Sequence, residues 1–140
     1  MTDRGILDTS TLVLLSRLDP EVLPEEPLIT TVTLAELSVG PLVATRRKER
    51  SSRQAVLQQA EADFEPLPFD AQSARAFGRV AASLRAEGRK VQARGYDAMI
   101  AATAIANDLP LYTVNPDDFS GIDDLDLRPI PHPAASKRPK

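Results

Sequence analysis

The sequence predicts an α/β fold: a three-layer α/β/α sandwich around a central, mostly parallel sheet. Short apolar runs alternate with longer helical patterns along the chain, and this alternation is typical of parallel sheets covered by helices. The length of 140 residues and the hydrophobic content of 42% suit one domain with a substantial core. We expect that domain over residues 1–130 and a flexible, proline-rich, basic tail over 131–140.

The first strand and helix are expected within the first 20 residues. The apolar run over 4–8 predicts a short buried strand. A helix follows over about 11–18, with Thr9 or Ser10 as its N-cap, because short hydroxyl side chains accept hydrogen bonds from the first free amides of a helix. The segment 19–27 contains three prolines and predicts a loop.

A second strand with two further helices is expected next. Residues 28–30 form a short apolar run that predicts the strand. Thr31 or Thr33 is expected to cap a helix that ends at 40–41, a Gly-Pro pair. A long polar helix over 43–62 has only a thin apolar stripe, so one of its faces should be exposed.

The middle of the chain predicts an edge strand and an amphipathic helix. Residues 64–67 are a strand candidate, at the edge of a sheet because of the proline. Asp70 is expected to cap a helix that ends at Gly88. Its apolar positions follow helical spacing: Phe77, Val80, Ala81 and Leu84.

The last elements surround a helix expected at the centre of the domain. Gly95–Asn107 has an almost wholly small and apolar interior, which is typical of a helix buried on all sides. The runs 111–114 and 125–128 predict two closing strands, the second weaker than the first.

Composition excludes several kinds of active site. The chain has no cysteine, so disulfides, thiolate zinc sites and a cysteine nucleophile are excluded, and a reducing cytoplasm is the expected location. The one histidine, His132, lies in the tail, which argues against a Ser-His-Asp triad. The net charge is -3, so a general nucleic-acid coat is not indicated. No apolar run has membrane-spanning length, and no membrane association is expected.

Isolated acidic and amide side chains border the apolar segments. They are Asp8, Glu36, Asp97, Asn115 and Asp118. Each has an ordinary structural explanation as a helix cap, a solvated helix residue or a turn residue. Functional groups of an open parallel sheet gather beyond the carboxyl ends of its strands, however, and these positions follow strands or begin helices. Clustered carboxylates repel one another unless a cation gathers them, and Mg²⁺ prefers such oxygen ligands.

Four stretches of the chain resemble the motifs of a known family. They are ILDTS (6–10), TLAEL (33–37), DAMIAATA (97–104) and TVNPDDF (113–119). Together they resemble the four motifs of PIN-domain ribonucleases, and most of all those of VapC-type toxins of bacterial toxin–antitoxin pairs. The match runs from about residue 4 to residue 130, in the right order and spacing.

The resemblance implies a PIN-like domain that is an Mg²⁺- or Mn²⁺-dependent endoribonuclease. It places Asp8, Glu36 and Asp97 at the three acidic positions that serve as catalytic and metal-binding residues. Asn115 and Asp118 are the further metal-binding candidates; family members often carry Asp at the fourth motif, whereas position 115 is Asn. Four positions are expected to line the site: Thr9, Ser10, Thr113 and Asp117.

The resemblance also implies partners: an RNA substrate, a small VapB-like antitoxin that obstructs the acidic pocket, and a second copy of the chain in a homodimer. Arg89, Lys90 and Arg94 precede Asp97 closely and are the expected RNA-binding residues. A second basic stretch, 46–53, is expected to be a solvated helix face instead of an RNA contact.

Two alternative functions remain open at this stage. One is a catalytically weak PIN-like module that binds RNA or protein, which Asn115 favours because an amide contributes no charge to a metal site. The other is a phosphatase of the haloacid type, which needs a second Asp two residues after the first. Ser10 occupies that position and argues against it.

Overall fold

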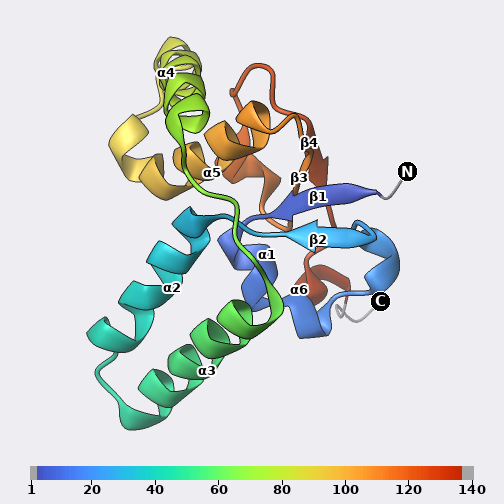
Figure 1. Ribbon diagram of the computed structural model, residues 1–140, viewed down its shortest axis with the longest axis vertical. Coiled ribbons are helices and arrows are strands. Elements are labelled where there is room, and N and C mark those ends of the chain that lie inside the picture. Colours follow the sequence, from blue (N-terminus) through green and yellow to red (C-terminus); the bar gives the residue numbers. More distant parts are fainter. Residues whose placement is uncertain (1–2, 137–140) are drawn as a thin grey trace.

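The computed structural model describes residues 3–136 and contains one four-stranded parallel sheet in the order β2-β1-β3-β4 (Figure 1). The strands are β1 (Arg4–Leu7), β2 (Glu26–Leu28), β3 (Leu111–Thr113) and β4 (Leu127–Pro129). β1 and β3 are the central strands, so their carboxyl ends meet in the middle of one sheet edge. The predicted α/β class with a parallel central sheet is confirmed.

Helices cover both faces of the sheet, and two of them form a projecting hairpin (Figure 1). The α-helices are α1 (Thr9–Val13), α2 (Thr31–Val43), α3 (Arg47–Asp63), α4 (Ala71–Ala86), α5 (Gly95–Ala106) and α6 (Pro133–Ser136). Short 3-10 helices are η1 (Leu15–Arg17), η2 (Pro20–Val22), η3 (Val91–Arg94) and η4 (Pro116–Phe119). α2 and α3 pack against each other as the hairpin, and α4 packs along the outside of α5.

Successive side chains of the central strands point to opposite faces of the sheet, so the core has two layers. Ile6 and Leu111 belong to the apolar cluster that includes α5. Their chain neighbours Leu7 and Tyr112 belong to the opposite cluster, beside α1 and η1. All four side chains are at most 8% exposed, and burial of each apolar side chain stabilises the fold by about 1.5–3 kcal/mol. Gly5 is required in β1, because a Cβ atom there would lie 2.4 Å from Cε1 of Tyr112.

The predicted pair of later helices is confirmed. Asp70 caps α4 by accepting a hydrogen bond from the Ser73 amide at 2.9 Å. Val80 and Leu84 of α4 are fully buried, and they belong to one cluster with the small residues Ala98 and Ala102 of α5. The small side chains let the two helices approach closely, which is why the interior of α5 reads as almost uniformly small and apolar.

The caps of the first two helices differ from the prediction. The N-cap of α1 is Asp8, not Thr9 or Ser10, so the helix begins directly after β1. The N-cap of α2 is Thr30, one residue before the predicted Thr31, and its hydroxyl accepts from the Thr33 amide at 3.2 Å. In both cases a side-chain oxygen of the expected chemistry caps the helix, but the chain offers several such side chains in succession.

The boundaries around the α2–α3 hairpin also differ. The helix does not end at the Gly-Pro pair, because Pro41 lies within α2, whose Gly40 carbonyl accepts from Arg53 Nη1 at 2.9 Å. The polar helix starts at Arg47, later than predicted.

The expected second and third strands are also corrected. β2 lies two residues before the expected 28–30, and its Pro27 is tolerated because β2 is an edge strand. Residues 64–67 form no strand and contribute only an isolated bridge between Leu67 and Thr30.

The last residues of the expected domain pack into the core, and the short helix α6 follows them. Ile130 is 7% exposed and packs beside Leu7 and Val114. The amide of Ala134, in α6, donates to Nδ1 of His132 at 3.1 Å. Residues 137–140 of the expected tail lie outside the described residues. Among residues 3–136, no helix combines the length and apolarity needed to cross a membrane.

Candidate active site

Asp8 lies at the carboxyl end of β1, where it caps α1 and is only 2% exposed. Its Oδ1 accepts hydrogen bonds from the amide of Thr11, at 3.2 Å, and from the hydroxyl of the same residue. Its Oδ2 accepts from the hydroxyls of Ser10 and Thr113, both at 2.9 Å. Burial raises the pKa of the Asp8 carboxyl more than these bonds lower it. The carboxylate is therefore held in one orientation at an electrostatic cost.

Asn115 joins the ends of the two central strands. Its amide Nδ2 donates to Ser10 Oγ at 3.0 Å, and its backbone N–H donates to Thr113 Oγ1 at 2.9 Å. Both hydroxyls in turn donate to Asp8. Because the nitrogen of the Asn115 side chain is engaged, its carbonyl oxygen is the group left to face a ligand.

Glu36 reaches the same region from the second turn of α2. Thr9 Oγ1 donates to Glu36 Oε1 at 2.6 Å and lies 2.9 Å from Thr33 Oγ1. Thr33 is fully buried, so this pair of hydroxyls links the start of α1 to the start of α2. Burial raises the pKa of the Glu36 carboxyl, and the nearby charge of Asp8 raises it further.

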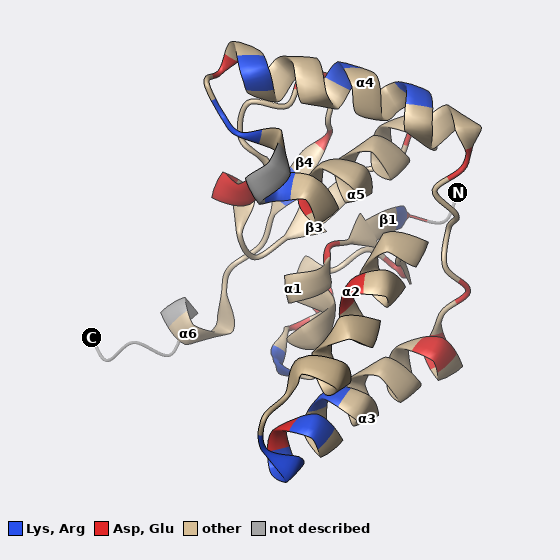
Figure 2. Cartoon of the chain, turned by 90° about the vertical axis from the view of Figure 1, so that its left-hand side faces the viewer, with Lys and Arg blue, Asp and Glu red and all other residues tan. Residues whose placement is uncertain are grey.

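Asp97, in the first turn of α5, carries the least compensated charge of the site. Burial, followed by repulsion from Asp118, Asp8 and Glu36, raises the pKa of Asp97 to about 7, although Arg94 lowers it in part. None of the side chains and amides that the structure describes in residues 3–91 and 94–134 donates a hydrogen bond to the Asp97 carboxylate. The charges of four carboxylates therefore act on one another. Figure 2 shows acidic segments of the ribbon at the starts of α1 and α5 and in α2.

The three expected RNA-binding residues, Arg89, Lys90 and Arg94, differ in what their side chains contact. Arg94 Nη1 pairs with Asp118 Oδ1 at 2.5 Å, and both side chains are about one-third exposed. Arg89 donates to backbone carbonyls of the η4 turn, including that of Asp117 at 3.1 Å. Lys90 is exposed. Asp117, expected to line the site, is exposed, and its backbone contacts Arg89 while its carboxylate makes no bond within the described residues.

The donors of this site suit a hard divalent cation in their chemistry. Carboxylate oxygens and the Asn115 carbonyl are ligands that Mg²⁺ and Mn²⁺ accept. The crowding that raises the Asp97 pKa is the cost that a cation would remove. Within residues 3–136, however, no three or more Asp, Glu or His side chains are arranged as a metal-binding cluster. The carboxylates share a neighbourhood without enclosing a common point.

The buried hydroxyls of Thr11 and Thr33 were not predicted to belong to the site. Thr11 donates to Asp8 and accepts from the Val114 amide at 3.1 Å, so it connects the start of α1 to the end of β3. Thr33 connects α1 and α2 through Thr9. A clue to both was available, since each lies three residues from a site carboxylate on a helix, Thr11 after Asp8 and Thr33 before Glu36.

The second basic stretch belongs to the hairpin. Arg50 donates to the Ala44 carbonyl at 3.3 Å, and Arg53 pairs with Glu49 at 2.6 Å. The Arg50 contact and the bond from Arg53 to the Gly40 carbonyl hold α3 against the end of α2, whereas the Arg53–Glu49 pair lies within α3. Residues 46–48 are exposed, and the interpretation of this stretch as a solvated helix face stays a prediction.

The known proteins that resemble this chain match it over the residues that form the site. Residues 6–125 match the model of the PIN domain family. The chain is 39% identical over 122 residues to Ribonuclease VapC5 of Mycobacterium tuberculosis, which covers 85% of this chain and 87% of that protein. It is 26% identical over 107 residues to Ribonuclease VapC of Rickettsia bellii, with 76% and 78% covered.

The fold is also similar to a solved toxin–antitoxin structure. The structure of VapBC-5 from Mycobacterium tuberculosis, described as a member of the VapBC family of toxin-antitoxin systems, superimposes with a TM-score of 0.78. The identity is 35%, and the match covers 91% of this chain and 99% of that one. The family match over residues 6–125 includes Asp8, Glu36, Asp97 and Asp118.

Proposed function

Because this chain belongs to the PIN-domain family, we propose that it is the endoribonuclease toxin of a toxin–antitoxin pair and acts on RNA in the cytoplasm. Its relatives named ribonucleases span most of its length. The observation that carries the proposal is the state of Asp97, whose pKa is raised to about 7 by burial and by three further carboxylates. Such perturbed acidic groups cluster where chemistry is performed.

We propose Asp8, Glu36 and Asp97 as the residues that hold an Mg²⁺ or Mn²⁺ ion, with Asn115 Oδ1 and Asp118 as further oxygen donors. When bound, such an ion polarises a phosphoryl oxygen and lowers the pKa of a coordinated water. Because Asn115 brings no charge, Asp118 is the residue that supplies the negative charge of the fourth motif.

The chain's own residues orient these groups. Thr11, Ser10 and Thr113 keep both Asp8 oxygens directed by hydrogen bonds, and Thr9 does the same for one oxygen of Glu36. Arg94 stands at the exposed edge of the site and neutralises part of its charge. We propose that Arg94 and Lys90 attract the RNA phosphates, which would otherwise be repelled by the carboxylates.

The RNA cleavage activity is expected to require a divalent cation. A fluorescent RNA oligonucleotide should be cut in Mg²⁺ or Mn²⁺ and remain intact in EDTA, because without the cation the carboxylates repel the phosphate. Gel electrophoresis of the products, with Ca²⁺ and the variant Asp97→Asn as controls, checks this result. Cleavage that persists in EDTA would contradict the proposed metal role.

A second candidate is a PIN-like module that binds RNA or protein and cleaves poorly. Two observations favour it: the amide at Asn115, and the absence of an enclosed cluster of metal-binding side chains within residues 3–136. The cleavage assay with and without the divalent cations separates the two candidates. A binding module retains the oligonucleotide in a mobility-shift assay while Mg²⁺ and Mn²⁺ leave it uncut.

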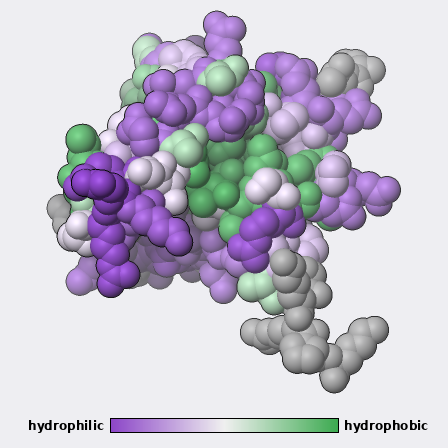
Figure 3. Space-filling model, turned by 90° about the horizontal axis from the view of Figure 1, so that it is seen from below, coloured by the Kyte–Doolittle hydropathy of each residue, from purple (hydrophilic) through white to green (hydrophobic). Residues whose placement is uncertain are grey.

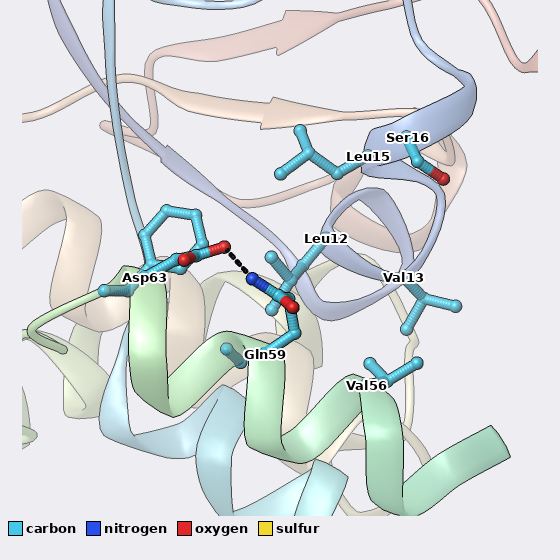
Figure 4. A pocket seen from close by; sticks show the side chains of 9 residues that line it. Leu12, Val13, Leu15, Ser16, Val56, Gln59 and Asp63 are labelled. Carbon is cyan, nitrogen blue, oxygen red and sulfur yellow. Dashed lines mark hydrogen bonds between the residues drawn. The ribbon is translucent and has the colours of Figure 1, made fainter.

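We propose that an antitoxin similar to VapB docks in an apolar groove beside the acidic site. A cavity of about 300 Å³ lies between α1 and α3, with Leu12 and Val13 facing Val56 and Gln59 (Figure 4). A second cavity of about 240 Å³ shares Val13 and Val56 and extends to Glu36. A segment bound along both cavities would therefore end at a site carboxylate.

Several large apolar side chains are exposed in this groove and at the end of α2. An apolar area lies between hydrophilic side chains on the face seen in Figure 3. Val13 is 49% exposed, Leu42 84% and Val43 61%, and exposed apolar side chains of this size are common at protein interfaces. We propose that the α2 end also contributes to a homodimer, which light scattering of the purified chain would detect.

Expression of the chain alone is expected to slow bacterial growth, and the antitoxin encoded beside it should restore growth. The variant Val13→Asp should remain toxic but resist this rescue, because it places a charge in the shared wall of both cavities. Growth curves with and without the antitoxin measure both effects. Ala82→Asp, on the exposed face of α4, is the matched control that the antitoxin should still rescue. Full rescue of Val13→Asp would place the antitoxin elsewhere.

A further inference from the structure

The end of α4 and the loop after it grip the η4 turn. Arg89 Nη1 donates to the Ser120 carbonyl at 2.8 Å and to the Ser120 hydroxyl, while its Nη2 donates to the Asp117 carbonyl at 3.1 Å. One guanidinium thus spans two carbonyls three residues apart, which its planar fork of N–H groups suits. Arg89 was expected to bind RNA, yet these contacts engage both of its terminal nitrogens.

Two further contacts hold the same turn. Gly121 adopts a φ of +84° and lies so close to Glu87 that a Cβ atom at position 121 would be 2.8 Å from the Glu87 Cγ. The amide of Asp123 donates to Ser83 Oγ at 3.3 Å. The turn is therefore held from behind by α4 and its exit loop, along residues 117–123.

The front of this turn carries two groups of the active site. Asn115 is tied to Ser10, and Asp118 raises the pKa of Asp97 by its charge. The amide of Asp118 donates to the Asn115 carbonyl at 3.1 Å, so the two residues share one short backbone loop. Any shift of the loop moves both groups relative to Asp8 and Asp97.

We propose that Arg89 is a positioning residue for RNA cleavage, which sets the η4 turn so that Asn115 and Asp118 reach the acidic site, and that it is not a phosphate contact. This proposal rests on the proposed nuclease function. It separates the basic residues after α4 into one that shapes the site, Arg89, and two that we propose face the RNA: the exposed Lys90 and the one-third exposed Arg94, which pairs with Asp118 through Nη1.

The variant Arg89→Lys distinguishes the two roles. Lysine keeps the positive charge that a phosphate contact would need, but its single ammonium cannot span both carbonyls. As a positioning residue, Arg89→Lys should lower kcat about tenfold or more with KM within about twofold, because small displacements of catalytic groups are costly. Arg79→Lys is the matched control: Arg79 is exposed on α4, its side chain makes no bond within the described residues, and its kinetics should stay unchanged.

A second measurement does not depend on catalysis. Hydrogen–deuterium exchange of metal-free protein should be at least about tenfold faster at the amides of Asp118 and Ser120 in Arg89→Lys than in wild type. The amides of α5 should be unaffected. If wild type cuts no RNA at all, the nuclease proposal fails while the exchange result still decides the role of Arg89. Unchanged exchange, or a raised KM with unchanged kcat, would overturn the positioning role.

Discussion

Replacing Asp97 by alanine is expected to slow RNA cleavage by a factor of about 100 or more, which corresponds to about 3 kcal/mol of lost transition-state stabilisation. Asp97 accepts no hydrogen bond from the groups that the structure describes in residues 3–91 and 94–134, and its charge is opposed by Asp118, Asp8 and Glu36. Its removal should therefore disturb the fold little while it deprives the site of a proposed metal ligand. Initial rates with an RNA oligonucleotide at saturating Mn²⁺ measure the effect.

Asp8→Ala should show a loss of similar size, with a structural component added. Three residues donate to the Asp8 carboxylate, and all would lose their acceptor in the variant. A thermal melt beside the kinetic assay separates the two contributions. Glu61→Ala, an exposed change on α3, is the control expected to cleave like wild type. Cleavage by Asp97→Ala at the wild-type rate would remove Asp97 from the catalytic site.

The second large effect concerns stability without metal. The pKa of Asp97 is about 7 in the folded protein and near 3.8 in an unfolded chain. Between these values the folded state binds a proton that the unfolded state has released, so the free energy of unfolding falls as pH rises. The stabilisation that protonated Asp97 gives the folded state is fully present below about pH 4 and is lost above about pH 7. Each pH unit in this interval amounts to about 1.4 kcal/mol, and the full loss to at most about 4 kcal/mol.

Asp97→Asn should therefore be more stable than wild type in EDTA at pH 8, by roughly 1–3 kcal/mol, because solvent screening of the partly exposed carboxyl and the lost helix-dipole interaction both reduce the full effect. The difference should shrink steadily from pH 7 to pH 4. Urea unfolding at several pH values measures it, and saturating Mg²⁺ should reduce the difference at pH 8 by stabilising wild type alone. Equal stability of the two proteins at pH 8 would mean that the Asp97 charge is already compensated.

Asp8→Asn is a poorer probe of the same repulsion. The hydroxyls of Ser10 and Thr113 donate to Asp8 Oδ2 while accepting from Asn115. An amide nitrogen at Oδ2 would present donors to two hydroxyls that already accept, so hydrogen bonds would be lost together with the charge. The Asp97 variant lacks this complication.

Local patterns in the sequence were sufficient for the elements with strong periodicity. The spacing of Val80 and Leu84 predicted α4, and the small apolar run after Asp97 predicted α5 as the buried helix. The position of β2 could not be predicted, because Pro27 is acceptable in a strand only when that strand lies at a sheet edge, which depends on the whole topology. Pro41 was expected to end its helix, but it lies inside α2.

The acidic residues could be selected from the sequence because each stands at a strand–helix junction, but their surroundings could not. Thr113 donates to Asp8 across 105 positions of the chain, and Arg89 reaches Ser120 across 31. No local pattern encodes such pairs. Arg89 was predicted to contact RNA because it is charged and lies near Asp97 in the sequence. The sequence does not show which carbonyl groups its guanidinium contacts in the fold.

The pairing of β1 with β3 determines when this protein can become active during its synthesis. Asp8 leaves the ribosome 105 residues before Thr113, which at about 5–20 residues per second is a delay of roughly 5–20 s. Until β3 docks beside β1, Asp8 lacks the Thr113 hydroxyl, one of its three hydroxyl donors. Asn115 is also not yet joined to Ser10. An interrupted or prematurely released chain therefore carries an incomplete site, and a cell that makes this protein is not exposed to its activity until the last strands are in place.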